Sequence, residues 1–287
     1  DGQVVNEFPT MADIEETQLL ILAYDVFKRY TKWFANDDST EWWYDSVKLW
    51  EICTASASAP TFFPPYPLQR ADEELPHIDG GVSANNPTVA AIAHALCLKE
   101  YDEKRKTRIK KPKTIDKIAV LSIGTGQTTR RYTYKEVEKW GLAKWAQKIP
   151  DIFLDPSAEN SEHISTRIFL GIEPKNYLRL NFKLEEVEKK SSSGENKEDI
   201  DIENLKIEED KNTFKISQNI DIDNPDICKI LSKASEVYLR EGKVYYDKKE
   251  NSDERREMDV KDAIDEFFDN VKKQDKKEED EKHLTGL

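Results

Sequence analysis

Residues Ile118–Ile123 read IAVLSI, a continuous apolar run that ends at once in Gly124-Thr125-Gly126. A strand with one face in water alternates apolar and polar residues, whereas an unbroken run indicates a strand that is buried on both faces. Such strands are typical of parallel sheets covered by helices. The run therefore predicts an α/β fold.

Other patterns along the chain alternate strands with helices. The predicted strands are Leu19–Val26, His77–Asp79 and Tyr177–Leu184. The predicted helices lie around 46–53, after Asn86 as N-cap with Pro87 as first helical residue, around 227–237 and around 260–271. This order indicates a mostly parallel sheet with helices on both faces.

The charge of the chain is concentrated in two segments. The sequence has 57 acidic and 44 basic residues, a net charge of −13. Residues 185–212 hold 11 acids and 5 bases, and residues 247–287 hold 15 acids and 10 bases. A nucleic-acid-binding face would need an excess of bases, and the basic stretch Lys99–Lys117 is better explained as a solvated helix end and loop. We therefore expect no nucleic-acid partner.

Asp79 is the residue that most invites a chemical interpretation. It stands at the end of a predicted strand and is followed by Gly80 and Gly81. Ligand crevices of open α/β sheets lie at strand ends, and glycine allows the backbone to approach a reacting group closely. A carboxylate there can act as a base for a hydroxyl nucleophile. Asp-Gly is also a common turn signal, so the dipeptide alone favours a turn.

The surrounding block resembles the patatin-like phospholipase family. The similarity rests on a small-residue run leading to Ala-Pro-Thr-x-Phe-Pro-Pro, on Asp-Gly-Gly and on Asn-Asn-Pro, which here are 57–65, 79–81 and 85–87. Three further pieces follow the same family order: Ala23-Tyr24-Asp25, Leu121–Gly126 and Asn176–Asn181. The resemblance covers about residues 15–185 and continues more faintly to about 245.

The resemblance implies a serine acyl hydrolase that cleaves phospholipids or other acyl-ester lipids with a Ser–Asp dyad. Asp79 would be the catalytic base, and Gly80 and Gly81 would support the motif. The family also has a serine on a Gly-x-Ser-x-Gly turn and a glycine-rich oxyanion loop, and neither occurs in this sequence. We therefore expect a patatin-like domain that is incomplete at the N-terminus, with the nucleophile on a missing N-terminal segment, and a chain that is inactive alone. The alternative is a non-catalytic patatin-like lipid-binding or regulatory module.

Two residues near Asp79 offer competing interpretations. Ser83, in Gly81-Val82-Ser83-Ala84-Asn85, lacks the second glycine of the nucleophile motif and is interpreted as a turn or helix-entry residue. His77 shares a strand face with Asp79, which keeps a Ser-His-Asp triad open, although a strand-end histidine that makes a structural hydrogen bond is the preferred interpretation.

The remaining expectations concern surroundings and organisation. The histidines, cysteines and acids show no metal-ligand spacing, and Gly124-Thr125-Gly126 is a poor dinucleotide fingerprint, so we expect neither metal nor cofactor. Cys53, Cys97 and Cys228 lie in apolar-periodic segments and are expected to be buried, reduced thiols. With no signal peptide visible, they favour a cytoplasmic protein that contacts membranes only peripherally. The predicted helix around 260–271 is expected to dock on its own domain rather than on a membrane.

Four segments are predicted along the chain. They are the C-terminal part of a patatin-like domain at 1–184, a charged insertion at 185–212, the helical end of the domain at 213–246 and a charged helical tail at 247–287.

Overall fold

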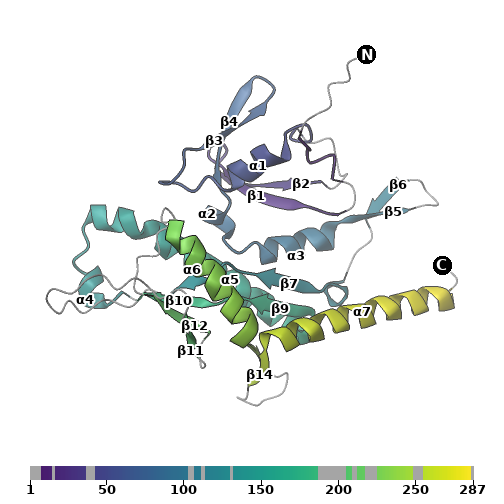
Figure 1. Ribbon diagram of the computed structural model, residues 1–287. Helices are drawn as coiled ribbons and strands as arrows, with labels where there is room; N and C mark the ends of the chain where they lie inside the picture. Colours follow the sequence, from purple (N-terminus) through teal and green to yellow (C-terminus); the bar gives the residue numbers. More distant parts are fainter. Residues whose placement is uncertain are drawn as a thin grey trace. The chain divides into compact units, whose positions relative to one another are not determined.

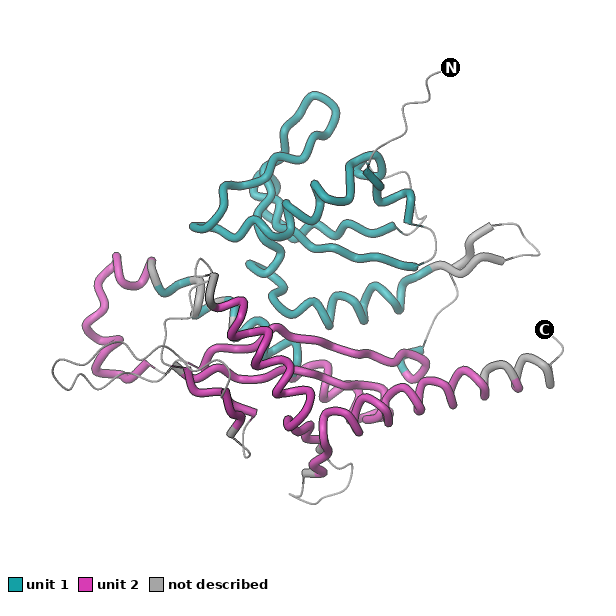
Figure 2. Tube along the Cα trace, viewed as in Figure 1, with its two compact units in different colours: residues 1–115, 147–162 teal, residues 116–146, 163–287 magenta. Residues whose placement is uncertain are grey.

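A computed structural model gives the conformation of most of the chain (Figure 1). It describes residues 8–14, 17–36, 43–102, 107–110, 114–129, 132–186, 205–208, 212–216, 225–247 and 255–285. These residues form two compact units, which Figure 2 shows in separate colours. Unit 1 comprises residues 1–115 and 147–162, and unit 2 comprises residues 116–146 and 163–287.

Unit 1 contains a four-stranded antiparallel sheet in the order β2-β1-β4-β3. Its strands are β1 (Leu20–Asp25), β2 (Tyr30–Ala35), β3 (Tyr66–Arg70) and β4 (Glu73–Asp79). The predicted strands at Leu19–Val26 and His77–Asp79 are thereby confirmed. Their antiparallel pairing was not anticipated, because two tight hairpins, β1–β2 and β3–β4, build the sheet.

Besides part of a longer helix described below, the described residues of unit 1 form three helices. They are α1 (Leu49–Ser56), α2 (Gly81–Ala84) and α3 (Thr88–Cys97). The predicted N-cap of α3 is off by one residue, because Pro87 is the capping position, although the Asn86 side chain still accepts a hydrogen bond from Thr88 N–H at 3.1 Å. A hairpin of β5 (Lys99–Asp102) and β6 (Thr107–Lys110) follows α3.

The core of unit 1 lies between α1 and the sheet. It consists of Met11, Ala23, Phe34, Tyr44, Val47, Ile52, Ala55 and Leu68. Tyr44 packs edge-on against Phe34, with 5.0 Å between the ring centroids. The ammonium group of the buried Lys32 lies 4.5 Å from the centre of the Tyr44 ring, and burial lowers the pKa of this lysine.

Unit 2 contains the parallel strands that the sequence predicts. Its strands are β7 (Val120–Ile123), β8 (Gln127–Thr128), β9 (Tyr177–Leu180), β10 (Lys183–Glu186), β11 (Ile207–Glu208), β12 (Thr213–Ile216), β13 (Lys243–Asp247) and β14 (Arg255–Asp259). β7 pairs in parallel with β9, and β10 pairs in parallel with both β8 and β12. The α/β class with parallel strands is therefore confirmed. The single strand predicted over Tyr177–Leu184 is divided into β9 and β10 at Asn181 and Phe182.

The helices of unit 2 cover its core. α6 (Pro225–Glu241) and α7 (Val260–Thr285) bury most of the periodic apolar residues that predict them, such as Ile230, Val237 and Phe267, whereas Phe268 is 46% exposed. A short helix α4 (Tyr134–Val137) precedes α5 (Leu142–Ile172), a 31-residue helix that was not predicted because it contains Pro150 and Pro156. Residues 147–162 of α5 belong to unit 1.

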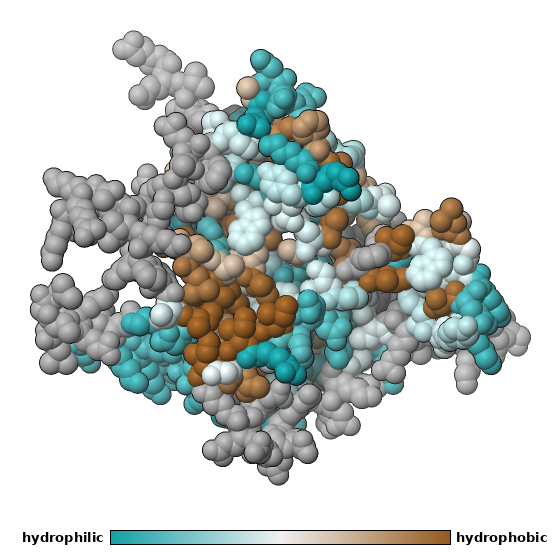
Figure 3. All heavy atoms as spheres, turned by 180° about the vertical axis from the view of Figure 1, so that it is seen from behind, coloured by the Kyte–Doolittle hydropathy of each residue, from teal (hydrophilic) through white to brown (hydrophobic). Residues whose placement is uncertain are grey.

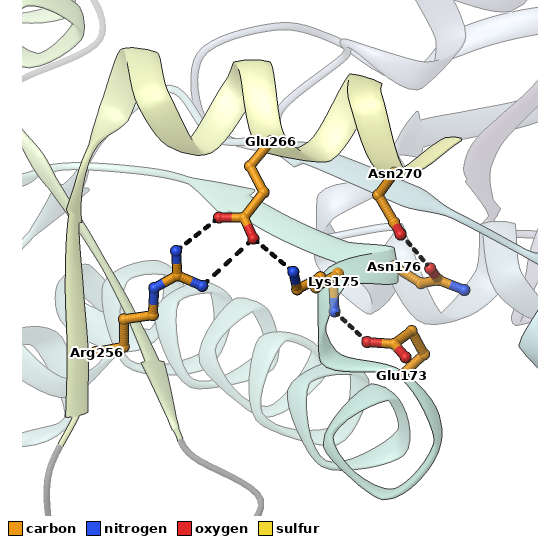
Figure 4. Close-up of polar contacts among 6 residues, drawn as sticks. All are labelled: Glu173, Lys175, Asn176, Arg256, Glu266 and Asn270. Atoms are coloured by element: carbon orange, nitrogen blue, oxygen red, sulfur yellow. Dashed lines mark hydrogen bonds and ion pairs between the residues drawn. The ribbon is translucent and has the colours of Figure 1, made fainter. Parts of the chain in front are cut away.

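Polar contacts dock α7 on the turn before β9 (Figure 4). The fully buried Asn176 donates to Asp116 O at 3.1 Å and accepts hydrogen bonds from Asn270 and Gln274 of α7 at 2.8 and 2.6 Å. Glu266 of α7 pairs with Lys175 at 2.8 Å and with Arg256 at 3.0 Å. The hydrogen bond from Lys175 and the charge of Arg256 lower the pKa of Glu266. These contacts confirm that the helix docks on its own domain.

The structure corrects the prediction for the cysteines and leaves that for the charged segment 185–212 largely untested. Cys53, Cys97 and Cys228 are unpaired, as expected, but they are exposed, so the prediction of buried thiols is wrong. Each lies on the outward side of a helix, where small side chains are tolerated. Most of the charged segment 185–212 lies outside the described residues.

Candidate active site

Asp79 is the last residue of β4, next to Ala23 of β1. Its backbone N–H donates to Ser58 O at 3.0 Å, and Gly80 N–H donates to Ser56 O at 3.2 Å. Both acceptors lie at the carboxyl end of α1, where the last carbonyl groups of a helix have no partner within the helix. The end of α1 therefore fixes the backbone on which the Asp79 side chain stands.

Gly80 is required by the close approach of β1. A Cβ at this position would lie 2.7 Å from the carbonyl carbon of Leu22 and closer still to its oxygen. The same Leu22 oxygen accepts a hydrogen bond from Ser56 Oγ at 2.7 Å. Because the hydrogen bond from Ser56 holds this carbonyl group in place, only glycine fits at position 80.

The Asp79 carboxylate is half-buried and is held on one side. Its Oδ1 accepts a hydrogen bond from Gly81 N–H at 2.6 Å. Among the described residues, Oδ2 has no hydrogen-bond partner. Burial raises the pKa of Asp79, and the Gly81 hydrogen bond partly opposes this rise. The arrangement offers one oriented carboxylate oxygen that can accept a proton.

His77 lies on the same strand and turns into the core. It is fully buried, and its Nδ1 lies 2.8 Å from Leu75 O. Because a carbonyl oxygen only accepts, Nδ1 carries the proton and Nε2 is an acceptor. Nε2 is buried and has no partner among the described groups. Its ring packs against Phe34 and Trp43, and burial lowers its pKa. The interpretation of His77 as a structural residue is confirmed.

Ser83 lies within α2, as its interpretation as a helix-entry residue requires. Its Oγ accepts a hydrogen bond from Thr31 Oγ1 at 2.7 Å and donates to Gly80 O at 3.3 Å. These bonds tie the turn after Asp79 to β2. The Ser83 hydroxyl therefore has a structural role, because both of its hydrogen bonds stabilise this turn.

Asn85 and Asn86 anchor the same turn on α5. Asn85 Nδ2 donates to Leu154 O and Asn86 Nδ2 to Ala158 O, both at 3.3 Å. Asn86 Oδ1 meanwhile accepts from Thr88 Oγ1 at 2.6 Å. The sequence predicts Asn86 as a helix cap and both asparagines as part of a motif, but it does not predict their contact with α5, because α5 itself was not predicted.

In unit 2, two other motif pieces lie side by side. Gly126 N–H, at the turn after β7, donates to Asn181 Oδ1 at 3.1 Å. A Cβ on Gly124 would clash with the Asn181 side chain, and Gly126 has a φ of +97°, which favours glycine. Arg179 of β9 donates to Ser122 of β7 at 3.0 Å. The close contact with Asn181 therefore explains why position 124 is glycine, and the positive φ explains why position 126 is glycine.

In the ranges that the structure describes, no three His, Cys, Asp or Glu side chains lie where they could hold a metal ion together. Within those same ranges, no helix combines the length and the apolar composition that crossing a membrane requires.

Comparison with known proteins places the motifs in a family. Residues 6–92 match the family described as patatin-like phospholipase. The chain is 30% identical to patatin-like protein 4 of Arabidopsis thaliana over 217 residues, which are 71% of this chain and 53% of that protein. It is 33% identical to patatin-like protein 1 of the same plant over 150 residues, 47% of this chain and 36% of the relative.

A rice relative gives a similar result. Patatin-like protein 1 of Oryza sativa subsp. indica is 31% identical over 156 residues, 50% of this chain and 38% of that protein. The chain thus spans between 36% and 53% of the length of these relatives. Over residues 6–92 the chain therefore matches the patatin-like phospholipase family, and over longer stretches it is similar to patatin-like proteins of plants.

Proposed function

We propose that the whole protein is a lipid acyl hydrolase and that Asp79 is its general base. The match of residues 6–92 to a phospholipase family supports the reaction class. The role of Asp79 as the base is supported most by the hydrogen bonding of its carboxylate. Gly81 N–H orients Oδ1, and no described residue forms a hydrogen bond with Oδ2. A carboxylate in this arrangement suits proton transfer from a hydroxyl nucleophile.

The proposed nucleophile is a serine outside these 287 residues, because the sequence holds no Gly-x-Ser-x-Gly. Asp79 takes the serine proton while the serine oxygen bonds to the ester carbonyl carbon. The bond to the lipid alcohol then breaks, and the alcohol leaves with the proton from Asp79. Water repeats both steps on the acyl-serine, which releases the fatty acid and restores the serine.

The raised pKa of Asp79 has a direct kinetic consequence. A general base works only in its deprotonated form, so activity falls as the pH drops through its pKa. Burial raises this pKa above the ordinary 3.8 of an aspartate. We therefore expect the acid limb of the kcat/KM profile to lie above pH 3.8.

The test compares Asp79→Asn with the unchanged full-length protein. We expect kcat on an ester substrate to fall by about 10²–10⁴-fold, which is typical for the loss of a general base. The control is Asp72→Asn, since Asp72 is exposed in the β3–β4 turn and should leave kcat unchanged. A fluorophosphonate probe should label a serine outside the 287 residues. Full activity of Asp79→Asn would refute the role of Asp79.

The same experiment addresses the alternative of a non-catalytic lipid-binding or regulatory module. That alternative predicts lipid binding by the full-length protein with no labelled serine and no turnover. We expect the 287-residue chain alone to bind lipid and to hydrolyse nothing, because it supplies the base without the nucleophile.

A further inference from the structure

The stretch between β8 and α5 exposes several large side chains. We call residues 132–146 the aromatic segment; it contains α4 and the first turn of α5 and lies wholly in unit 2. Leu142 is 88% exposed, Tyr134 79% and Trp145 40%. In Figure 3, brown and pale atoms gather at the right-hand edge, to which the 180° turn brings α4. Single exposed apolar residues are ordinary, but a cluster of them marks an interaction site.

The aromatic rings of this segment pack on one another. Trp140 lies edge-on between Tyr132 and Trp145, with centroid distances of 4.9 and 5.1 Å. None of the three belongs to the buried core cluster of unit 2. The three rings therefore pack on one another outside the core. These ring contacts do not cover Leu142, whose side chain remains exposed to water.

The charge of the segment differs in sign from that of the chain. The aromatic segment holds three basic and two acidic residues, a net charge of +1 in a chain of −13, and Arg130 and Arg131 directly precede it in the sequence. Lys135, Lys139 and Lys144 are all exposed. Tryptophan and tyrosine favour the headgroup level of a bilayer, a leucine can enter the acyl boundary, and lysines attract anionic headgroups.

Charge also argues against a second copy of the chain as the occupant. A symmetric dimer places the same patch against itself, so the positive segment would meet its own like charge. An anionic lipid surface complements both the charge and the exposed apolar groups. It therefore fits the segment better than self-association does.

We propose that the aromatic segment binds an anionic lipid surface, with Leu142 and Trp145 entering the boundary between headgroups and acyl chains. Lys135 and Lys139 then face lipid phosphates. The inference rests on the proposed function only in naming the bilayer as the place where substrate is met. The binding itself needs neither Asp79 nor a nucleophile.

The experiment measures partition of the 287-residue chain onto vesicles. We expect it to bind vesicles of phosphatidylcholine with phosphatidylserine, and to bind pure phosphatidylcholine more weakly. Leu142→Ser should weaken partition about tenfold, as the loss of one buried leucine side chain does. Lys135→Gln and Lys139→Gln should each weaken it about fivefold. Added salt should reduce binding further.

The control is Leu239→Ser, because Leu239 is a leucine of α6 with 43% exposure and lies outside the segment. It should bind like the unchanged chain. Circular dichroism checks that each variant is folded. Brominated lipids should quench tryptophan emission less in Trp145→Phe than in the unchanged chain.

Several results would overturn the inference. They are no partition onto anionic vesicles, equal partition of Leu142→Ser, or a dimer in light scattering that Leu142→Ser dissociates without any effect on lipid binding. Hydrolysis of a soluble short-chain ester by the full-length protein, combined with no vesicle binding, would refute this inference and leave the proposed function standing. Vesicle binding by a full-length protein that hydrolyses no ester would refute the proposed function and leave this inference standing.

Discussion

Gly80 carries no side chain because β1 lies directly against it. Gly80→Ala should destabilise the chain by about 1–3 kcal/mol, since the new Cβ meets the Leu22 carbonyl group. Gly171→Ala is the matched control, because a Cβ there meets nothing within 4 Å and α5 is helical at that point. It should stabilise by about 0.5–1 kcal/mol. Urea unfolding measures both, and equal stability of the two variants would contradict the prediction.

His77 makes the stability of unit 1 depend on pH. Its folded pKa is lowered by burial and by Lys32, while Asp25 and the Leu75 carbonyl oppose the shift. The unfolded chain therefore binds more protons below pH 6.5, and the free energy of unfolding decreases as the pH falls from that value toward the folded pKa.

The test follows the free energy of unfolding in urea between pH 7 and pH 5. His77→Leu removes the titrating ring, so we expect its stability to vary less over this range than that of the unchanged chain. His163→Gln is the control, because His163 is exposed. A pH dependence that is unaltered in His77→Leu would show that other groups are responsible.

At the scale of single residues, the sequence identified Asp79 through a family resemblance and not through its own pattern. The dipeptide Asp79-Gly80 alone favours a turn, and the contacts of Gly80 with Leu22 come from strands far apart in the chain. The cysteines were mispredicted for a related reason. A small apolar residue within an amphipathic helix can face either way, and composition does not decide which.

At the scale of elements, the docking of α7 depends on Asn176. Asn176→Ala should destabilise unit 2 by roughly 2–4 kcal/mol, because it leaves donors of Asn270 and Gln274 and the Asp116 carbonyl without their partner. Lys272→Ala removes only an exposed pair with Asp269 at 3.9 Å and should cost less than about 0.5 kcal/mol.

Two measurements check the role of Asn176. Urea unfolding gives the change in stability, and limited proteolysis shows whether α7 is cut sooner. If Asn176→Ala and Lys272→Ala are equally stable and equally resistant, the buried contacts shown in Figure 4 do not hold the helix.

Elements with a strong apolar period were predicted well. The run Ile118–Ile123 predicted β7 and its parallel pairing, and α6 repeats apolar residues at helical spacing, so local sequence sufficed for both elements. The expected burial of β7 on both faces was wrong, because Ile123 is 70% exposed. α5 was missed because Pro150 and Pro156 normally end a helix. The division between β9 and β10 was missed because the alternating pattern continues through it, and Asn181 turns away to bind Gly126.

At the scale of the whole molecule, net charge governs solubility. The chain carries −13 at pH 7 and has an isoelectric point of about 5.0. Proteins associate most readily where their net charge vanishes. We expect light scattering of a dilute solution to peak near pH 5 and to fall on either side. A peak above pH 6 would show that exposed apolar groups, and not net charge, control association.

The parallel pairing of β7 with β9 sets an order of folding. The β1–β2 hairpin closes over a short turn, whereas β7 reaches its partner only after all of α4 and α5 have intervened. Closing a long loop costs chain entropy before any contact compensates for it, and non-local strands therefore pair slowly. The hairpins of unit 1 should thus acquire hydrogen-exchange protection early during refolding, and the amides of β7 and β9 should acquire it last.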